Sequence, residues 1–105
     1  MDRLKAIKQL KFRPFLMELI GTFALCYIGG WACIMAQAGK INLLAVALAH
    51  MSVLAAFIYV GASISGGHYN PAVTLALFLT KNHSLEKTFF YILFQFMGSF
   101  MAGYV

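Results

Sequence analysis

Charged side chains are scarce in this chain of 105 residues, where Asp, Glu, Lys and Arg make up 10% and hydrophobic residues 62%. A single soluble domain of this size needs a more polar surface, so the composition excludes that class and indicates a membrane protein. Cysteine is nearly absent as well. Cys26 and Cys33 lie seven residues apart on one predicted helix, roughly 10 Å along its axis, which is too far for a disulfide. We expect both to be small core residues.

The chain contains three long apolar runs, over residues 15–35, 43–62 and 89–105. Each is long enough to cross a bilayer as a helix, although the third is at the short end of the usual range. The third run is still apolar where the sequence stops, which we interpret as an internal point of a longer protein. The sequence therefore predicts an all-α, multi-pass integral membrane protein.

Basic residues are distributed unevenly around these runs, and not in the pattern of a nucleic-acid-binding patch. Five of them precede the first run, two lie between residue 80 and the third run, and only Lys40 separates the first two runs. Because positively charged loops stay in the cytosol, we expect a cytosolic N-terminal arm over residues 1–14 and a cytosolic loop over 81–87. The charge of the arm either sets this topology alone or also contacts anionic lipid in the bilayer.

A polar, glycine-rich segment at residues 65–74 interrupts the apolar pattern between the second and third runs. The apolar stretch that follows it, residues 71–79, would form a helix only about 14 Å long, roughly half the thickness of a ~30 Å hydrocarbon core. Asn70 is a favoured N-cap, and Pro71 suits the first helical turn. We therefore expect a re-entrant half-helix over residues 70–79 that stops near the middle of the membrane.

The chemistry of this segment is that of a pore for neutral solutes. Irregular backbone at such depth is tolerated only where it is buried in protein or lines a watery cavity. Gly66 and Gly67 carry no side chains, so backbone carbonyls can face such a cavity, and Asn70 offers an amide donor. The positive end of the half-helix opposes cations and protons. The simpler alternative, a glycine-rich turn before a capped soluble helix, does not fit the apolar surroundings.

Glu18 is the only charged residue in the first apolar run. An intramembrane carboxylate is costly and usually faces the interior of the helix bundle with a partner. The alternative is that Glu18 reaches the cytosolic interface beside Arg13.

The second and third runs also carry single polar residues. His50 either packs within the protein or faces a pore in its outer third. Gln95 is expected to be a buried hydrogen-bonding residue. Gly98 and Ala102 form a small-residue face for helix packing.

The sequence does not favour an enzyme, a metal site or a cofactor site. Ser63, Ser65 and His68 suggest a nucleophile and a base, but they are too close in sequence, and no third orienting group accompanies them. Histidines at positions 50, 68 and 83 fall on three different predicted elements, which argues against a shared metal.

Three groups of these residues together resemble the aquaporin, or major intrinsic protein, family in its N-terminal half. Residues 65–74 are similar to the family's first Asn-Pro-Ala signature. Glu18 with Gly21-Thr22 resembles its first-helix pattern, and Gln95 with Gly98 resembles its third-helix pattern. The resemblance covers nearly all of the chain from Phe15 onward.

The resemblance implies an aquaporin-like helical bundle, of which this chain would supply three transmembrane helices and one half-helix. In the family, six spans and two half-helices form two inverted repeats around one pore, and four units assemble into a homotetramer. The implied function is a passive channel for water and small neutral solutes. Asn70 would donate to the solute and the carbonyls of Gly66, Gly67 and His68 would accept from it. Residues with a structural role around the pore would be Glu18, which braces the loop backbone, and Pro71, Ala72 and Gln95.

His50 stands twenty residues before Asn70, where the family places one position of its outer aromatic/arginine filter. A histidine there is similar to plant vacuolar-membrane members and to some ammonia-permeable ones, which implies water plus ammonia, glycerol or another small neutral solute. The second Asn-Pro-Ala motif and the filter arginine are missing from these residues. We therefore expect the front half of a channel that does not conduct alone. The alternative is a non-conducting half-channel that associates with full-length subunits and modulates them.

Overall fold

The computed structural model describes residues 11–105 of the protein, so most of the predicted arm over residues 1–14 lies outside the described residues. The secondary structure in this part of the chain is helical, with no strand. The four helices are α2 (Phe12–Gln37), α3 (Leu43–Gly61), α4 (Pro71–Leu79) and α5 (Leu85–Tyr104).

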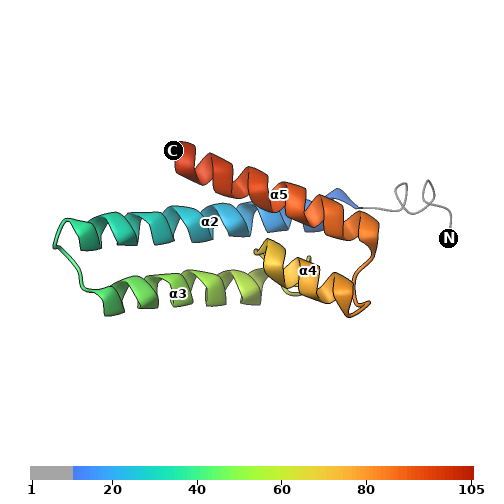
Figure 1. Ribbon diagram of the computed structural model, residues 1–105, viewed down its shortest axis with the longest axis horizontal. Helices are drawn as coiled ribbons and strands as arrows, with labels where there is room; N and C mark the ends of the chain where they lie inside the picture. The colour runs from blue at the N-terminus through green and yellow to red at the C-terminus, as the bar shows by residue number, and fades with distance from the viewer. Residues whose placement is uncertain (1–10) are drawn as a thin grey trace.

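Helices α2 and α3 form a long antiparallel hairpin (Figure 1). The turn between them leads into α3, where the Asn42 side chain caps the helix by accepting a hydrogen bond of 2.8 Å from the Ala45 N–H. Helix α5 packs along the first part of α2, and the short α4 packs against α5 near the end of α3. The loop over residues 62–70 therefore lies where all four helices meet.

Two helices begin earlier than the apolar runs alone predicted. Helix α2 begins at Phe12 and contains Pro14 in its first turn, where the missing N–H of proline removes no intrahelical hydrogen bond. Helix α5 begins at Leu85 because Ser84 caps it, accepting from the Lys87 N–H at 3.2 Å. The charged residues Glu86 and Lys87 therefore belong to the first turn of α5, since capping rather than hydropathy sets the helix start.

Glycine allows α5 to lie directly on α2. Gly98 of α5 is buried, and a Cβ atom there would collide with the backbone carbonyl oxygen of Leu19 and approach the Phe23 nitrogen. A small residue at this point is therefore required for the two backbones to approach so closely.

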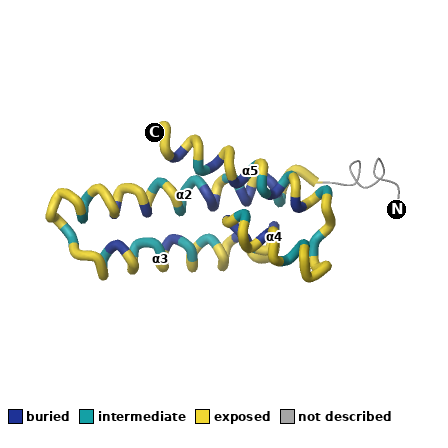
Figure 2. The backbone as a smooth tube through the Cα atoms, viewed as in Figure 1, coloured by how far each residue is buried: buried dark blue, intermediate teal, exposed yellow. Residues whose placement is uncertain are grey.

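Much of the outer surface is apolar. Among residues 11–105, α2 and α3 are the two helices that are long and apolar enough to cross a membrane. Figure 2 shows exposed residues along the outer sides of both helices and buried residues concentrated near α4 and the start of α5. Large exposed side chains such as Leu43, Leu44 and Met51 on α3 suit contact with lipid or with another protein surface.

The prediction that the two cysteines are core residues is wrong. Cys26 and Cys33 are both exposed free thiols. Cys26 lies one helical turn after Thr22 and Cys33 one turn after Gly29, close to the buried side of α2, yet neither is covered. Cys26 lines an open cavity beside the end of α5. In a membrane helix an apolar outer face contacts lipid, so apolar character alone does not indicate which side is buried.

Candidate functional site

The Glu18 carboxylate is the centre of the polar cluster, and it is fully buried. Its Oε2 accepts from the Ser65 hydroxyl at 2.6 Å and from the His68 N–H at 3.1 Å. Its Oε1 accepts from the Tyr69 N–H and from the Gln95 side-chain amide, both at 2.7 Å. Four donors therefore compensate the buried charge, which a carboxylate inside a protein requires. The two backbone N–H groups among them fix the loop before α4.

The loop backbone turns through conformations that side chains seldom adopt. Gly66 and Gly67 have φ angles of 92° and 68°, in the left-handed region open to glycine. Tyr69 has a φ of 55°, an unfavourable value that its hydrogen bond to Glu18 helps to hold.

The Tyr69 ring is an anchor between the two long helices. Its hydroxyl donates to the Phe57 carbonyl at 2.6 Å. Gly21 of α2 and Gly61 of α3 leave the space that the ring occupies, because a Cβ atom at either position would collide with it. The half-helix is thus attached to the hairpin through one aromatic side chain as well as through Glu18.

A second set of contacts ties α4 to α5. The Gln95 side-chain amide also donates to the Thr74 hydroxyl at 2.9 Å, and Thr74 donates in turn to the Asn70 carbonyl at 3.3 Å. The His68 Nδ1 lies 2.9 Å from the same Thr74 oxygen. The Tyr91 hydroxyl donates to the Ser65 carbonyl at 2.6 Å. Together these contacts fix the first turn of α4 in position and direction.

The start of α4 presents an unused donor. The Oδ1 of Asn70 caps the helix by accepting from the Ala72 N–H at 2.9 Å, and Pro71 occupies the first turn. The Nδ2 group of Asn70 has no hydrogen-bond partner within the described residues, and Asn70 and Ala72 are exposed. A solute at this point can therefore accept a hydrogen bond from Asn70 without competition from the protein.

Unused acceptors lie directly before this donor. Inside residues 11–105, no hydrogen bond reaches the carbonyl oxygens of Gly66, Gly67 or His68. The His68 side chain does not share this exposure. It is 7% exposed and turned into the polar cluster, so only the backbone of His68 is available to a solute.

His50 lies apart from this cluster on α3. It is eleven residues before the end of the helix at Gly61, which is roughly 16 Å along the axis. Its Nδ1 donates to the Val46 carbonyl at 2.8 Å, and its ring faces Gly29 of α2. The structure therefore gathers five sequence-predicted residues at the loop, namely Glu18, Gly66, Gly67, His68 and Gln95, beside Asn70, Pro71 and Ala72, and places His50 elsewhere.

The structure brings two histidines together that the sequence analysis assigned to separate elements. The rings of His68 and His83 lie 5.1 Å apart, and Tyr91 lies 4.5 Å from His83 and 4.9 Å from His68. His83 belongs to the loop between α4 and α5. Burial lowers the pKa of His83, and the nearby His68 and Lys87 lower it further, against an opposing effect of Glu18.

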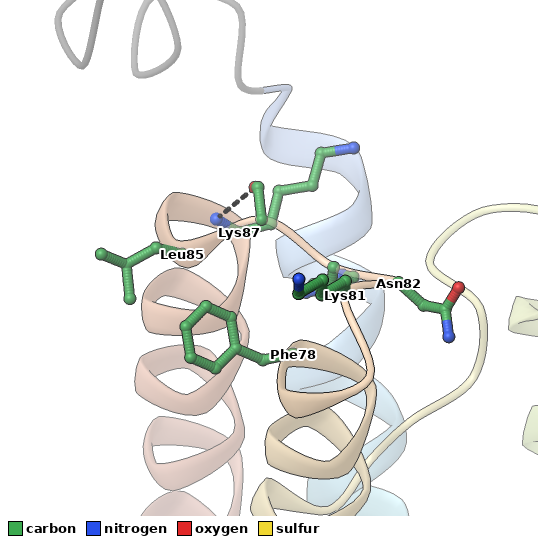
Figure 3. Close-up of a pocket in the computed structure, with 7 residues that line it drawn as sticks. Phe78, Lys81, Asn82, Leu85 and Lys87 are labelled. Atoms are coloured by element: carbon green, nitrogen blue, oxygen red, sulfur yellow. Dashed lines mark hydrogen bonds between the residues drawn. The ribbon is translucent and has the colours of Figure 1, made fainter. Parts of the chain in front are cut away.

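Basic side chains surround two cavities beside this ring cluster. One cavity of about 480 Å³ includes Lys11, His68, His83, Lys87 and Tyr91 in its lining. Figure 3 shows the other, of about 600 Å³, where Phe78, Lys81, Asn82, Leu85 and Lys87 line the junction between α4 and α5. No acidic residue of the described chain lines either cavity.

Sequence reasoning missed four residues that complete the site, namely Ser65, Tyr69, Thr74 and Tyr91. Ser65 and Tyr69 lie within the glycine-rich segment, and the resemblance implied that Glu18 braces this loop without naming these two residues as its contacts. Thr74 is a polar residue in an otherwise apolar half-helix, and that isolation was the available signal.

The comparisons with known proteins agree with this geometry. A sequence model described as "Major intrinsic protein" matches residues 5–105. The chain is similar to glycerol uptake facilitator protein-like 6 of Lactiplantibacillus plantarum, with 33% identity over 91 residues, covering 87% of this chain and 41% of that protein. It is similar to aquaporin TIP4-4 of Zea mays, with 39% identity over 97 residues, covering 86% of this chain and 38% of that protein.

A third relative, aquaporin PIP1-2 of Zea mays, is 33% identical over 93 residues, covering 84% of this chain and 32% of that protein. The chain thus spans about a third to two fifths of the length of these curated relatives. The all-helical structure and the match over residues 5–105 confirm the resemblance found in the sequence: the chain belongs to the major intrinsic protein family.

Proposed function

We propose that this chain forms half of the wall of a passive channel for water and small neutral solutes such as ammonia or glycerol. The observation that carries the proposal is the unused Nδ2 donor of Asn70, which follows three unused backbone acceptors at residues 66–68. A relative named a glycerol uptake facilitator and relatives named aquaporins support the same class of solute.

The proposed path lets a small polar molecule exchange hydrogen bonds as it passes. A water molecule would donate to the carbonyls of Gly66, Gly67 and His68 and then accept from Asn70. The N-terminus of α4 adds a partial positive charge at the same point. That field would oppose cations and protons, while a neutral solute crosses without an electrostatic penalty.

The proposed topology has α2, α3 and α5 crossing the membrane and α4 entering and leaving it on the cytosolic side. The basic cavities around Lys81, His83 and Lys87 would then face the cytosol, together with the N-terminus. Assembly as a homotetramer belongs to the proposal for the complete channel and is drawn from the family alone.

The alternative function is regulatory. Since this chain spans about a third to two fifths of its relatives' length, it would associate with full-length channel subunits and alter their activity without conducting itself. Co-purification with a full-length relative from a shared membrane tests this alternative, and a chain that stays monomeric in detergent contradicts it.

The test of the channel proposal is an osmotic shrinkage assay on proteoliposomes. The chain is reconstituted alone, and together with the remaining C-terminal part of aquaporin TIP4-4 of Zea mays. We expect water permeability above that of empty liposomes only in the second preparation. Water permeability from the chain alone would contradict the proposal that it forms only half of the channel wall. No permeability in either preparation would contradict the proposal that it is part of a channel.

Asn70→Asp probes the donor in the conducting preparation. The substitution keeps the capping oxygen but removes the amide donor and adds a charge, so we expect water permeability to fall and cation exclusion to weaken. Asn42→Asp is the matched control, because Asn42 caps α3 in the same way at the far end of the hairpin. Equal permeability and equal ion exclusion in both variants would refute the role of Asn70.

A further inference from the structure

The loop between α4 and α5 holds a lysine in a backbone conformation that glycine normally adopts. Lys81 has a φ angle of 64°. It follows the end of α4 in a Schellman motif, in which the N–H groups of Lys81 and Asn82 return to carbonyls of the last helical turn. Glycine is the usual residue at the position of Lys81, because a side chain is unfavourable in the left-handed region.

The same motif ends α2, and there glycine occupies the equivalent position. The N–H groups of Gly39 and Lys40 return to the last turn of α2, and Gly39 has a φ angle of 76°. The two helix ends thus share one geometry and differ in the residue at its centre. A lysine held in this unfavourable conformation indicates a role for its ammonium group.

The side chain of Lys81 lines the basic cavity of about 600 Å³ between α4 and α5, together with His83 and Lys87 (Figure 3). Neither Lys81 nor Lys87 forms an ion pair with another described residue. Glu86, the one acid of α5, does not line this cavity. Unpaired ammonium groups around one cavity favour a ligand that carries a phosphate group.

An exposed apolar stripe continues along α5 from the same cavity. Its members recur every three or four residues, and so share one side of the helix: Leu85, Phe89, Leu93, Phe96 and Phe100. Leu85 also lines the basic cavity, and the far end of the stripe forms an apolar groove of about 340 Å³ with Met97 and Met101. The stripe is roughly 23 Å long, more than the ~15 Å depth of one leaflet.

We propose that the basic cavity and the apolar stripe together bind one anionic phospholipid, with its phosphate at Lys81 and Lys87 and an acyl chain along α5. A soluble phosphate would use only the cavity, and a partner helix would use only the stripe. A lipid matches the positive charge and the adjoining apolar surface in a single molecule. The inference rests on the proposed topology, in which α5 crosses the membrane, and does not depend on conduction.

The test measures how tightly the first lipid binds. Native mass spectrometry of the chain in detergent is followed during titration with phosphatidylglycerol or with phosphatidylcholine. We expect Lys81→Gly to weaken the binding of phosphatidylglycerol about fivefold, the contribution of one lysine near an anionic headgroup, and to leave phosphatidylcholine unaffected. Lys40→Gly is the matched control, because it removes one charge beside the equivalent motif of α2. Equal phosphatidylglycerol binding in the two variants would overturn the inference.

A second measurement separates lipid binding from a folding defect. Glycine adopts the φ angle of residue 81 without a steric penalty, so Lys81→Gly should unfold in denaturing detergent no more easily than the unmodified chain. Weaker lipid binding with undiminished stability would support the site. A clear loss of stability would contradict the strained lysine on which the inference rests.

Two competitors identify the occupant. We expect phosphatidylglycerol to stay bound in millimolar inorganic phosphate, and complete displacement would make the cavity a site for soluble anions, against the proposal. If the C-terminal complement of the channel displaces the lipid, the stripe is a contact between channel halves, and the proposal also fails. Absence of water permeability, in contrast, overturns the proposed function and leaves this lipid site intact.

Discussion

Different interactions stabilise the two ends of the structure, the loop over residues 62–70 and the turn between α2 and α3. At the loop end, the side-chain hydrogen bonds of Glu18 join residues 47 to 77 positions apart in the sequence. At the turn between α2 and α3, the side-chain hydrogen bonds of Asn42 and His50 reach only three or four residues away. Gly29, which leaves space for the His50 ring, and apolar packing make up the rest of that end, where Figure 2 shows mainly exposed and half-buried residues.

This difference shows where the sequence specifies a unique arrangement. Apolar contacts between helices compete with equally apolar lipid, so they favour packing without fixing one geometry. Buried polar groups leave no such freedom, because each unpaired donor or acceptor destabilises the fold. The half-helix is therefore positioned by its polar contacts, and the hairpin mainly supports it.

Replacing the buried acid Glu18 should have the largest effect on stability, because it removes the polar contacts that distinguish the loop end from the turn end. Glu18→Ala leaves four neutral donors without their acceptor, and we expect it to destabilise the fold by about 3–5 kcal/mol, because each buried donor left unpaired costs about 1–3 kcal/mol. Unfolding in mixed detergent micelles with increasing denaturing detergent measures the change. A loss below roughly 1 kcal/mol, the net worth of one ordinary hydrogen bond, would contradict the central role of Glu18.

The close approach of α2 and α5 offers a test that does not alter polarity. Gly98→Ala puts a methyl group against the Leu19 carbonyl, and we expect a loss of about 1–3 kcal/mol from overpacking. Gly103→Ala on the same helix meets nothing within 4 Å and is the control. Equal stability of the two variants in the same unfolding assay would show that α5 does not rest on α2 in this way.

The Tyr69 anchor should have a smaller effect. Tyr69→Phe keeps the ring between Gly21 and Gly61 but removes the hydrogen bond to Phe57, and we expect a loss of about 1 kcal/mol. Tyr59→Phe is the control, because Tyr59 is 88% exposed. If both variants unfold alike, the hydroxyl of Tyr69 contributes nothing to the attachment of the loop.

The pH dependence at His83 should be the smallest effect. Its pKa is lowered in the folded chain, mainly by burial, so the unfolded chain binds more protons. The stability associated with neutral His83 is then fully present above the ordinary histidine pKa of about 6.5 and is lost as the pH falls through the lower folded value. Melting of the chain between about pH 5 and 8 should show this loss, and His83→Gln should reduce it. If His83→Gln leaves the dependence of stability on pH unchanged, the assignment of this dependence to His83 is contradicted.

Much of the site could be predicted from the sequence because its signals are local. The Asn-Pro pair, the two glycines and the short apolar stretch after them indicate a capped half-helix without any tertiary information. A single acid inside a long apolar run likewise indicates a buried carboxylate that needs partners.

The partners themselves could not be predicted, because they are set by packing. Nothing local indicates that Thr74 contacts Gln95, or that the His83 ring lies against the rings of His68 and Tyr91. The exposure of Cys26 and Cys33 was missed for a related reason, since apolar character alone does not show which residues of a membrane helix are covered by another helix.

The most direct test of the central claim is the water permeability of Asn70→Asp in the reconstituted pair of chain and C-terminal complement, measured beside Asn42→Asp. Both variants retain a capping oxygen, so both should fold. We predict that permeability falls and cation leakage rises only in Asn70→Asp, because only that variant loses the free donor at the tip of α4. Identical permeability and ion exclusion in the two variants would contradict the claim that this tip is the solute site.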